Sequence, residues 1–274
     1  MSTRSSQYPI YQVDAFSGAV FSGNPAAIVP LDAWLPDGVM QQIAMENQLS
    51  ETAFFVPDGE KFRLRWFTPT VEVDLCGHAT LAAAHVILAE LKERGDEVVF
   101  SSKSGELPVR KSEDGYTMDF PSDEVAATTD ESLEDSLGAE VSELYRGRHD
   151  YLAVLKNETE VRGLTPDFRK LARVQARGVL VTAPAEDPSS DVDFVSRCFF
   201  PRTGIDEDPV TGSAHTTMAP FWSARLGHDR LRAFQCSKRG GVVDCEVRGE
   251  RVFLSGNAVT FLRGEVFLPT ADKF

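Results

Sequence analysis

Short apolar segments with strand-like and helix-like spacing follow one another along the first third of the chain. Apolar residues that alternate with polar ones, or form a short continuous run, are typical of strands, and apolar residues three and four apart indicate a helix. The pattern predicts strands over residues 8–15, 26–30, 52–56, 62–67, 98–100, 107–111 and 116–120. It predicts helices over residues 37–47 and 79–93. This mixture is typical of an α/β protein.

An acidic segment rich in Thr and Ser, residues 121–134, then interrupts the pattern, and we interpret it as a linker that runs into a helix. The rest of the chain continues in the style of the first part. It contains predicted strands over residues 151–155, 178–182, 193–200, 242–246, 251–255 and 259–266, and a predicted helix over residues 214–226. We therefore expect two domains, residues 1–120 and residues 121–261.

The two halves share a short internal repeat. Its two copies are Arg65-Trp-Phe-Thr-Pro69 with Arg197-Cys-Phe-Phe-Pro201, and Asp74-Leu-Cys-Gly-His-Ala-Thr80 with Asp208-Pro-Val-Thr-Gly-Ser-Ala214. In each copy a strand ends at a proline, a loop carries an aspartate, and a glycine opens a helix of small apolar residues. Allowing for a few inserted residues, the repeat aligns Asp74 with Asp208 and Cys76 with Thr211. It predicts two structurally related halves that face each other.

Composition narrows the class of protein. The chain has 274 residues, 42% of them hydrophobic, and its 28 Lys and Arg against 42 Asp and Glu give a net charge of −14. A surface this acidic repels nucleic acid and anionic membranes. No stretch reaches the roughly 20 apolar residues that span a bilayer, and the first nine residues lack the apolar core of a signal peptide. We expect a cytoplasmic protein whose partner is a small molecule.

The cysteines of the chain are Cys76, Cys198, Cys236 and Cys245, and none forms a C-x-x-C pair. We expect free thiols in a reducing compartment. A zinc site is not expected, because Cys76 and His78 have no second pair of ligands at a suitable spacing. Cys76 precedes a helix start, where it is either a packing residue or a thiol able to act as nucleophile or base.

The two helix starts are the strongest candidates for a binding site. A helix N-terminus presents unpaired backbone N–H groups and partial positive charge, and a glycine there lets a ligand approach. Gly77 and Gly212 open the two helices beside His78, Asp208 and Ser213. Two such starts that face one another across a cleft would hold a carboxylate or an enolate-like oxyanion. The alternative is a simple tight turn into each helix.

Glu51 and His78 are candidate acid/base or substrate-orienting groups. Glu51 begins an apolar segment, and a carboxylate beside apolar walls takes and returns a proton near neutral pH. A solvated glutamate at a strand end is the alternative. His78 lies in the first turn of its helix, where the dipole favours a neutral imidazole. Within Asp206-Glu207-Asp208 we select Asp208, because it aligns with Asp74 and lies nearest the helix start.

Six motifs, in order along the chain, carry a resemblance to a known family. They are Val13-Asp-Ala-Phe16, Gly23-Asn-Pro-Ala26, Leu49-Ser-Glu-Thr-Ala-Phe54, Phe67-Thr-Pro69, Cys76-Gly-His-Ala-Thr80 and Asp208-Pro-Val-Thr-Gly-Ser-Ala214. Together they resemble the PhzF-like proteins, which are named for an isomerase of phenazine biosynthesis. The resemblance implies a diaminopimelate-epimerase-like fold: two similar α/β (α+β) domains, each a curved, mostly antiparallel sheet around a central helix. It also implies that the last strand, about residues 262–274, returns to the first domain.

The resemblance also implies residue roles. The family's acid/base glutamate carries to Glu51, and its histidine and aspartate carry to His78 and Asp208. Together with the helix starts, it implies that the substrate-binding residues are Asn24, Gly77, Gly212 and Ser213. Members of the family are commonly homodimers that need no cofactor or metal.

The first functional hypothesis is therefore a cofactor-independent isomerase, in which Glu51 moves a proton between two carbons of a small carboxylate. The phenazine isomerase itself acts on trans-2,3-dihydro-3-hydroxyanthranilate, and the resemblance does not fix the substrate of this chain. Two alternatives stay open: a non-catalytic protein that binds a small carboxylate, and a thiol-dependent epimerase that uses Cys76. Related epimerases use two cysteines, and Thr211 at the second position favours the proton shift by one base.

Overall fold

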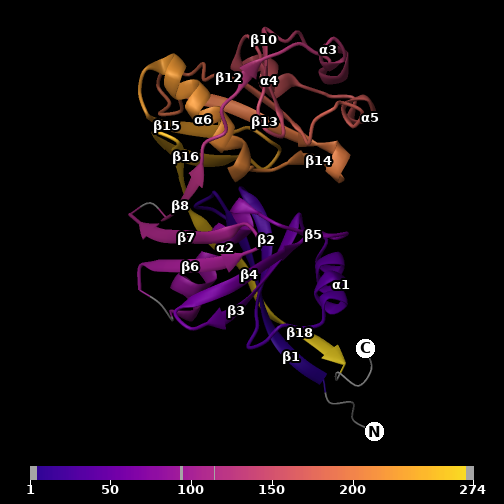
Figure 1. The fold of residues 1–274 in the computed structure, drawn as a ribbon, viewed down its shortest axis with the longest axis vertical. Helices are drawn as coiled ribbons and strands as arrows, with labels where there is room; N and C mark the ends of the chain where they lie inside the picture. Colours follow the sequence, from indigo (N-terminus) through magenta and orange to yellow (C-terminus); the bar gives the residue numbers. More distant parts are fainter. Residues whose placement is uncertain (1–4, 93–94, 114, 270–274) are drawn as a thin grey trace. The chain divides into compact units, whose positions relative to one another are not determined.

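The computed structural model of the protein describes residues 5–92, 95–113 and 115–269. The chain divides into two compact units, each a mixture of strands and helices (Figure 1). Unit 1 consists of Met1–Val20, Pro25–Tyr116 and Asn257–Phe274, and unit 2 consists of Phe21–Asn24 and Thr117–Gly256. Glu93 of the predicted second helix and residues 270–274 of the predicted last strand lie outside the described residues. Within the described ranges, no helix is long and apolar enough to cross a membrane.

Unit 1 is a sheet with one central and one peripheral helix. Its strands are β1 (Ser5–Ala15), β2 (Asn24–Pro30), β3 (Glu51–Asp58), β4 (Lys61–Phe67), β5 (Glu72–Val73), β6 (Glu97–Ser102), β7 (Gly105–Ser112) and β18 (Ala258–Pro269), and its helices are α1 (Asp37–Asn47) and α2 (Gly77–His85), which continues as a π-helix over Val86–Leu91. β2 and β3 are parallel, and β3 and β4 are antiparallel. β4 also pairs antiparallel with β5 and parallel with β6, and β6 pairs antiparallel with β7. β18 pairs antiparallel with β1 (Figure 1).

Helix α2 is the centre of unit 1. Its residues from His78 to Ala84 are all buried, and β1, β3 and β18 pack against it. A helix that is buried on every side has no solvent face, so it is stable only where other elements surround it. Its alanines allow the neighbouring strands to pack closely. The predicted buried helix from residue 79 is confirmed, and the structure begins it at Gly77.

Unit 2 is a second sheet with its own central helix. Its strands are β8 (Gly115–Pro121), which leads into it from unit 1, β9 (Ala126–Ala127), β10 (Glu143–Arg146), β11 (Tyr151–Val154), β12 (Val179–Pro184), β13 (Phe194–Phe200), β14 (Ile205–Asp208), β15 (Arg230–Gln235), β16 (Gly241–Arg248) and β17 (Arg251–Gly256), and its helices are α3 (Ser132–Leu137), α4 (Glu158–Gly163), α5 (Phe168–Leu171) and α6 (Gly212–Leu226). The sequence pattern did not predict β10, β14, β15, α4 or α5. The helix predicted over residues 214–226 is confirmed as α6.

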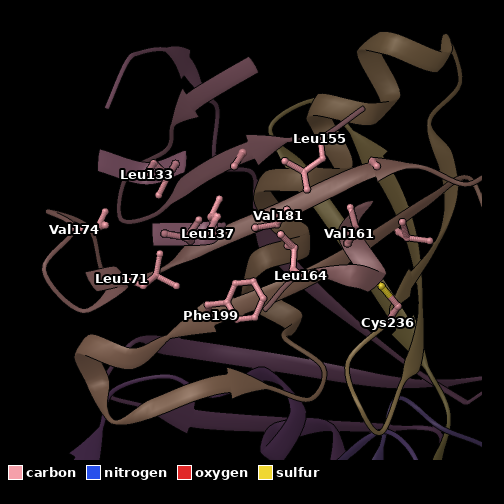
Figure 2. Close-up of a cluster of buried hydrophobic side chains, with 14 of the residues drawn as sticks. Leu133, Leu137, Leu155, Val161, Leu164, Leu171, Val174, Val181, Phe199 and Cys236 are labelled. Carbon is pink, nitrogen blue, oxygen red and sulfur yellow. The ribbon is translucent and has the colours of Figure 1, made fainter. Parts of the chain in front are cut away.

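One face of the unit 2 sheet carries a buried apolar cluster (Figure 2). Leu137 of α3, Val161 of α4 and Leu171 of α5 pack there with Val181 of β12 and Phe199 of β13. Burying an aliphatic or aromatic side chain of this size contributes about 1.5–3 kcal/mol. The short helices, each too short to be stable alone, are therefore held by the apolar side chains that they bury against the sheet.

The strand pairings of the two units follow the same order. In unit 2, β11 and β12 are parallel and β12 and β13 are antiparallel. β13 pairs antiparallel with β14 and parallel with β15, which is antiparallel to β16. The central helix follows the short strand in both units: α2 comes after β5, and α6 comes after β14. The internal repeat predicted from the sequence is confirmed by this topology.

A paired arginine and glutamate mark the same place in both copies. Arg65 on β4 donates to both carboxylate oxygens of Glu72 on β5, at 2.8 and 2.9 Å. Arg197 on β13 donates in the same way to Glu207 on β14, at 2.7 and 2.8 Å. Such two-pronged contacts are stronger than single hydrogen bonds, so each fastens the short strand that leads to the central helix.

The strand register corrects one detail of the sequence repeat. Trp66 pairs with Val73 in unit 1, as Cys198 pairs with Asp208 in unit 2. The counterpart of Asp208 is therefore Val73 and not Asp74, whose side chain is exposed. The sequence alignment was wrong here because it matched the two aspartates, whereas the hydrogen-bonded register aligns the residues one position earlier in the first copy.

Candidate active site

Glu51, Cys76 and His78 form a buried cluster in unit 1. Glu51 is the first residue of β3, His78 lies in the first turn of α2, and Cys76 is the N-cap residue of that helix. His78 Nε2 lies 3.2 Å from Glu51 Oε2, and His78 Nδ1 lies 3.5 Å from Cys76 Sγ. The packing of α2 against β3 brings these groups together. The imidazole therefore lies between a carboxylate and a thiol.

The cluster is largely closed to solvent. The Glu51 side chain is 12% exposed, and those of His78 and Cys76 are less exposed. Glu51 Oε2 is buried, and within the described residues no hydrogen bond of good geometry reaches it, so its contact with His78 is an ion-pair contact. A solvated glutamate at a strand end does not fit this burial. An oxygen with its lone pairs available in such a place is suited to accept a proton.

The protonation of the cluster follows from its burial and its charges. Burial, and then the Glu51 carboxylate, raise the pKa of the Cys76 thiol to about 11, so the thiol is protonated at neutral pH. Burial lowers the pKa of His78, but the contacts with Cys76 and Glu51 outweigh it, and the pKa lies well above the ordinary 6.5. The Glu51 carboxylate at 3.2 Å therefore favours the charged imidazole and opposes the neutral form expected from the helix end.

The start of α2 presents backbone donors beside this cluster. Cys76 has an extended backbone, and its side chain makes no capping hydrogen bond to the described residues of the helix. Its thiol contacts the His78 ring at 3.5 Å, and the backbone N–H of Ala79 also acts on it. Gly77 is the first helical residue, so no side chain blocks the approach of a ligand to the backbone there. The first turn of α2 is therefore suited to hold a carboxylate or an oxyanion near Glu51.

Asn24 and Asp208 form a second polar cluster, in unit 2. The buried Asp208 carboxylate accepts a hydrogen bond of 2.7 Å from Asn24 Nδ2 and one of 2.5 Å from Thr211 Oγ1. Asn24 Nδ2 also donates to the carbonyl oxygen of Val210, at 2.9 Å. Both oxygens of Asp208 are thus engaged, which suits an orienting group better than a base. Asn24 positions Asp208, and substrate binding by Asn24 stays a prediction.

Gln235, at the end of β15, completes this second cluster, and sequence reasoning missed it. Its side chain is fully buried. Gln235 Oε1 accepts a hydrogen bond of 2.8 Å from the Thr211 amide, and Nε2 donates to the Asp208 carbonyl oxygen at 2.7 Å. Gln235 therefore fixes the turn from β14 into α6, where Gly212 and Ser213 begin the helix. Nothing in the local sequence marks it, because its partners lie far away along the chain.

The loop Phe21–Asn24 is fastened to unit 2 by Arg239. Arg239 Nε donates to the carbonyl oxygen of Gly23 at 2.8 Å, and Nη2 donates to that of Ser22 at 3.0 Å. Hydrogen bonds from a charged guanidinium are among the stronger ones in proteins. This anchoring explains how a residue from the N-terminal part of the chain comes to hold Asp208.

The predicted site residues thus fall into two groups, one at each central helix. The structure brings together Glu51, Gly77 and His78 in unit 1, and Asn24, Asp208, Gly212 and Ser213 in unit 2. That the two groups serve one substrate stays a prediction. The cysteines all lie in the described part of the chain and are free and buried, as expected.

Comparison with known proteins identifies the family. The chain matches the model of the phenazine biosynthesis-like proteins (PhzC-PhzF) over residues 13–264. It is 51% identical over 261 residues to an uncharacterized isomerase of Pseudomonas aeruginosa, and the match covers 94% of this chain and 98% of that protein. The chain therefore belongs to the phenazine biosynthesis-like family, and the resemblance inferred from its motifs is confirmed.

Solved structures agree with this membership. The crystal structure of a phenazine biosynthesis protein of the PhzF family from Enterococcus faecalis superposes with a TM-score of 0.91 at 48% identity, covering 96% of this chain and 100% of that one. A hydroxyproline epimerase from Agrobacterium vitis has a TM-score of 0.61 at 12% identity, covering 99% of this chain and 94% of that one, and this likeness shows the fold alone. The predicted epimerase-like α/β fold is confirmed.

Proposed function

We propose that this protein is a cofactor-independent isomerase that moves a proton between two carbons of a small carboxylate, with Glu51 as acid and base. The reaction class is supported by relatives that are named isomerases. The observation that carries the proposal is the buried Glu51 carboxylate at 3.2 Å from His78, at the start of a helix without a side-chain cap among the described residues. Such a carboxylate is able to take a proton from carbon and to return it.

The two units differ at the position of Glu51, and this difference supports a mechanism with a single base. The registers of β3 with β4 and of β12 with β13 align Glu51 with Gly178. A Cβ atom on Gly178 would lie 2.2 Å from the ring of Phe200, so a side chain at this position would collide with the core. The first unit thus holds a carboxylate where the second holds a glycine. One base that removes and returns the proton gives a shift between carbons, whereas inversion by two bases needs a partner for Glu51.

The remaining site residues have supporting roles in this proposal. Loss of the proton leaves negative charge on the substrate, and the backbone donors that begin at Gly77 are suited to stabilise it. His78, as a cation, offsets the charge of the buried carboxylate beside it. Asp208 orients the substrate, and the α6 start at Gly212 and Ser213 binds its carboxylate.

A thiol-dependent epimerase is the less favoured reading of the same site. Its base would be the Cys76 thiolate, but the pKa of this thiol is raised to about 11. Its second base would come from the equivalent position in unit 2, where Thr211 has no basic group. The homodimer, the cytoplasmic location and the relation to the phenazine precursor stay predictions.

Proton exchange in D₂O, followed by NMR, tests the proposal. The panel contains small unsaturated and amino carboxylates and includes trans-2,3-dihydro-3-hydroxyanthranilate. We expect deuterium to enter one of them, and Glu51→Gln to slow its entry by about 10²–10⁴-fold, the usual loss for one acid/base group. Glu46→Gln, which changes an exposed carboxylate of α1 in the same unit, is the matched control.

The outcomes separate the three hypotheses. Exchange at the wild-type rate in Glu51→Gln would overturn the assignment of the base. Exchange that is abolished by Cys76→Ser but survives Glu51→Gln would identify the thiol-dependent epimerase. Binding of a panel compound by the wild type without any exchange would identify a binding protein.

A further inference from the structure

The cluster at the start of α2 also combines the donor types of a metal site. Glu51, Cys76 and His78 offer a carboxylate oxygen, a sulfur and a ring nitrogen that all lie within 4.8 Å of one another. The sequence shows no second pair of ligands near Cys76 and His78, but β3 supplies the third ligand from a distant part of the chain. We infer that these three residues bind a thiophilic divalent cation such as Zn²⁺, and that the bound ion inhibits the isomerase.

One donor atom from each of the three residues lies within 4.8 Å of the others, somewhat wider than the ligand spacing of bound zinc. Bond lengths of about 2.3 Å to sulfur and about 2.0–2.2 Å to nitrogen and oxygen place neighbouring ligand atoms about 3.5 Å apart. Cys76 Sγ and His78 Nδ1 are 3.5 Å apart, and Glu51 Oε2 and His78 Nε2 are 3.2 Å apart. Since these contacts reach opposite nitrogens of one ring, a neighbouring side chain must turn toward the nitrogen that binds. Three protein ligands leave the fourth position for water.

Charge and donor softness select the ion. A divalent cation is stable in a buried site when anionic ligands balance its charge. The Glu51 carboxylate and a Cys76 thiolate together balance two positive charges. The Cys76 thiol proton and one ring proton of His78 pass to the buffer as the metal–sulfur and metal–nitrogen bonds form. Mg²⁺ and Ca²⁺ prefer oxygen ligands, and the cluster offers one carboxylate beside a sulfur and a nitrogen. Zn²⁺ and Co²⁺ are therefore the ions that fit.

Inhibition follows from the identity of one ligand. A carboxylate that is bound to a metal ion is no longer available to take a proton from substrate. This consequence rests on the proposed role of Glu51 as the base, whereas metal binding itself does not depend on the reaction.

Titration of the metal-free protein with Zn²⁺ by calorimetry, and with Co²⁺ by absorption spectroscopy, tests the site. We expect one ion per chain and a thiolate-to-cobalt charge-transfer band. Cys76→Ser removes the band and weakens Zn²⁺ binding by at least about 100-fold, since even the loss of an outer-shell partner weakens metal binding by about 10–100-fold. Cys245→Ser changes a buried cysteine of unit 2 outside the cluster and leaves both signals unchanged.

Each further outcome decides one part of the proposal. A wild-type protein without saturable Zn²⁺ binding, or binding that is unchanged in Cys76→Ser, would overturn the site. Should Cys76→Ser fail to fold, Glu51→Gln serves instead, and we expect it to weaken Zn²⁺ binding by at least 10-fold while the cobalt–thiolate band remains. Full isomerase activity with one Zn²⁺ bound would overturn the inhibition. Activity that survives Glu51→Gln would overturn the proposed base and leave the metal site standing.

Discussion

The starts of α2 and α6 occupy equivalent places in two related units, but their carboxylates are held differently. In unit 1, the nearest described partner of Glu51 Oε2 is the His78 ring, in an ion-pair contact. In unit 2, Asn24 and Thr211 donate to both oxygens of Asp208. Hydrogen bonds to a carboxylate stabilise its charged form and make it a weaker base. A repeated scaffold has thus acquired one end suited to proton transfer and another suited to orientation.

The largest effect that we expect separates these two carboxylates. Glu51→Gln removes the proposed base and slows deuterium exchange by about 10²–10⁴-fold. Asp208→Asn keeps an oxygen able to accept a hydrogen bond, so it weakens substrate binding and slows exchange less than Glu51→Gln. Exchange rates measured below and at saturating substrate concentration distinguish weaker substrate binding from a slower proton transfer. If the exchange rate at saturating substrate fell more in Asp208→Asn than in Glu51→Gln, the assignment of the base to Glu51 and of orientation to Asp208 would be contradicted.

The next effect concerns the glycine that stands in unit 2 where unit 1 has Glu51. In Gly178→Ala, the new Cβ atom meets the Phe200 ring at 2.2 Å and the Phe199 carbonyl oxygen at 2.8 Å. We expect a loss of about 3 kcal/mol in the free energy of unfolding, as for an overpacked core. Chemical denaturation measures it, with Gly163→Ala as control, because a Cβ there meets no described atom within 4 Å. Equal stability of the two variants would contradict this explanation.

A smaller effect is expected where Gln235 holds the turn before α6. Gln235→Leu leaves the Thr211 amide and the Asp208 carbonyl oxygen without the partner they have now. A buried group that loses its hydrogen bond costs about 1–3 kcal/mol, and we expect the free energy of unfolding to fall by about 2 kcal/mol. The control is Gln175→Leu, at an exposed position of the same unit. An unchanged denaturation midpoint for Gln235→Leu would show that the turn is held by other contacts.

The smallest effect that we expect is the contribution of the Arg65–Glu72 ion pair to the free energy of unfolding. The hydrogen bonds from Arg65 hold the pKa of Glu72 at about 2, below its ordinary 4.5. A carboxylate with a lowered pKa in the folded state stabilises the fold above about pH 4.5, and this contribution is lost as the pH falls toward 2. Because the pair is partly exposed, it contributes about 1 kcal/mol.

Measuring the free energy of unfolding of wild type and Glu72→Gln between pH 2 and about pH 6 tests this contribution. We expect the difference in free energy of unfolding between the two proteins to be constant near pH 6 and to disappear as the pH falls toward 2. Glu207→Gln removes the carboxylate charge of the equivalent pair in unit 2. A difference for Glu72→Gln that persists to pH 2 would mean that the glutamate acts through packing and not through its charge.

Much of the fold was predictable from local patterns. The helix over residues 37–47 and the strands that flank it show the apolar spacing of their type, and the structure matches them. β5 and β14 are too short for a periodic pattern, so they were not predicted. Without these two strands, the alignment of the two copies relied on residue identity and matched Asp208 with Asp74. The strand register shows that the counterpart of Asp208 is Val73.

The site was predictable only in part. The motifs marked Glu51 and His78, but their contact depends on the packing of α2 against β3, which no local spacing encodes. The helix dipole alone favoured a neutral His78, and the opposing effect of the Glu51 carboxylate became visible only once the fold placed it at 3.2 Å. Gln235 lies outside every motif, and only the fold joins it to Thr211.

The pairing of β18 with β1 has a consequence for folding during synthesis. β18 (Ala258–Pro269) completes unit 1, yet the ribosome makes it after the whole of unit 2. Domains generally fold as units while the chain is being synthesised, usually the N-terminal one first. Here the order is reversed: unit 2 is complete while the older residues of unit 1 still await their final strand. The pairing of β18 with β1 therefore waits until residues 117–256, nearly all of unit 2, have been made.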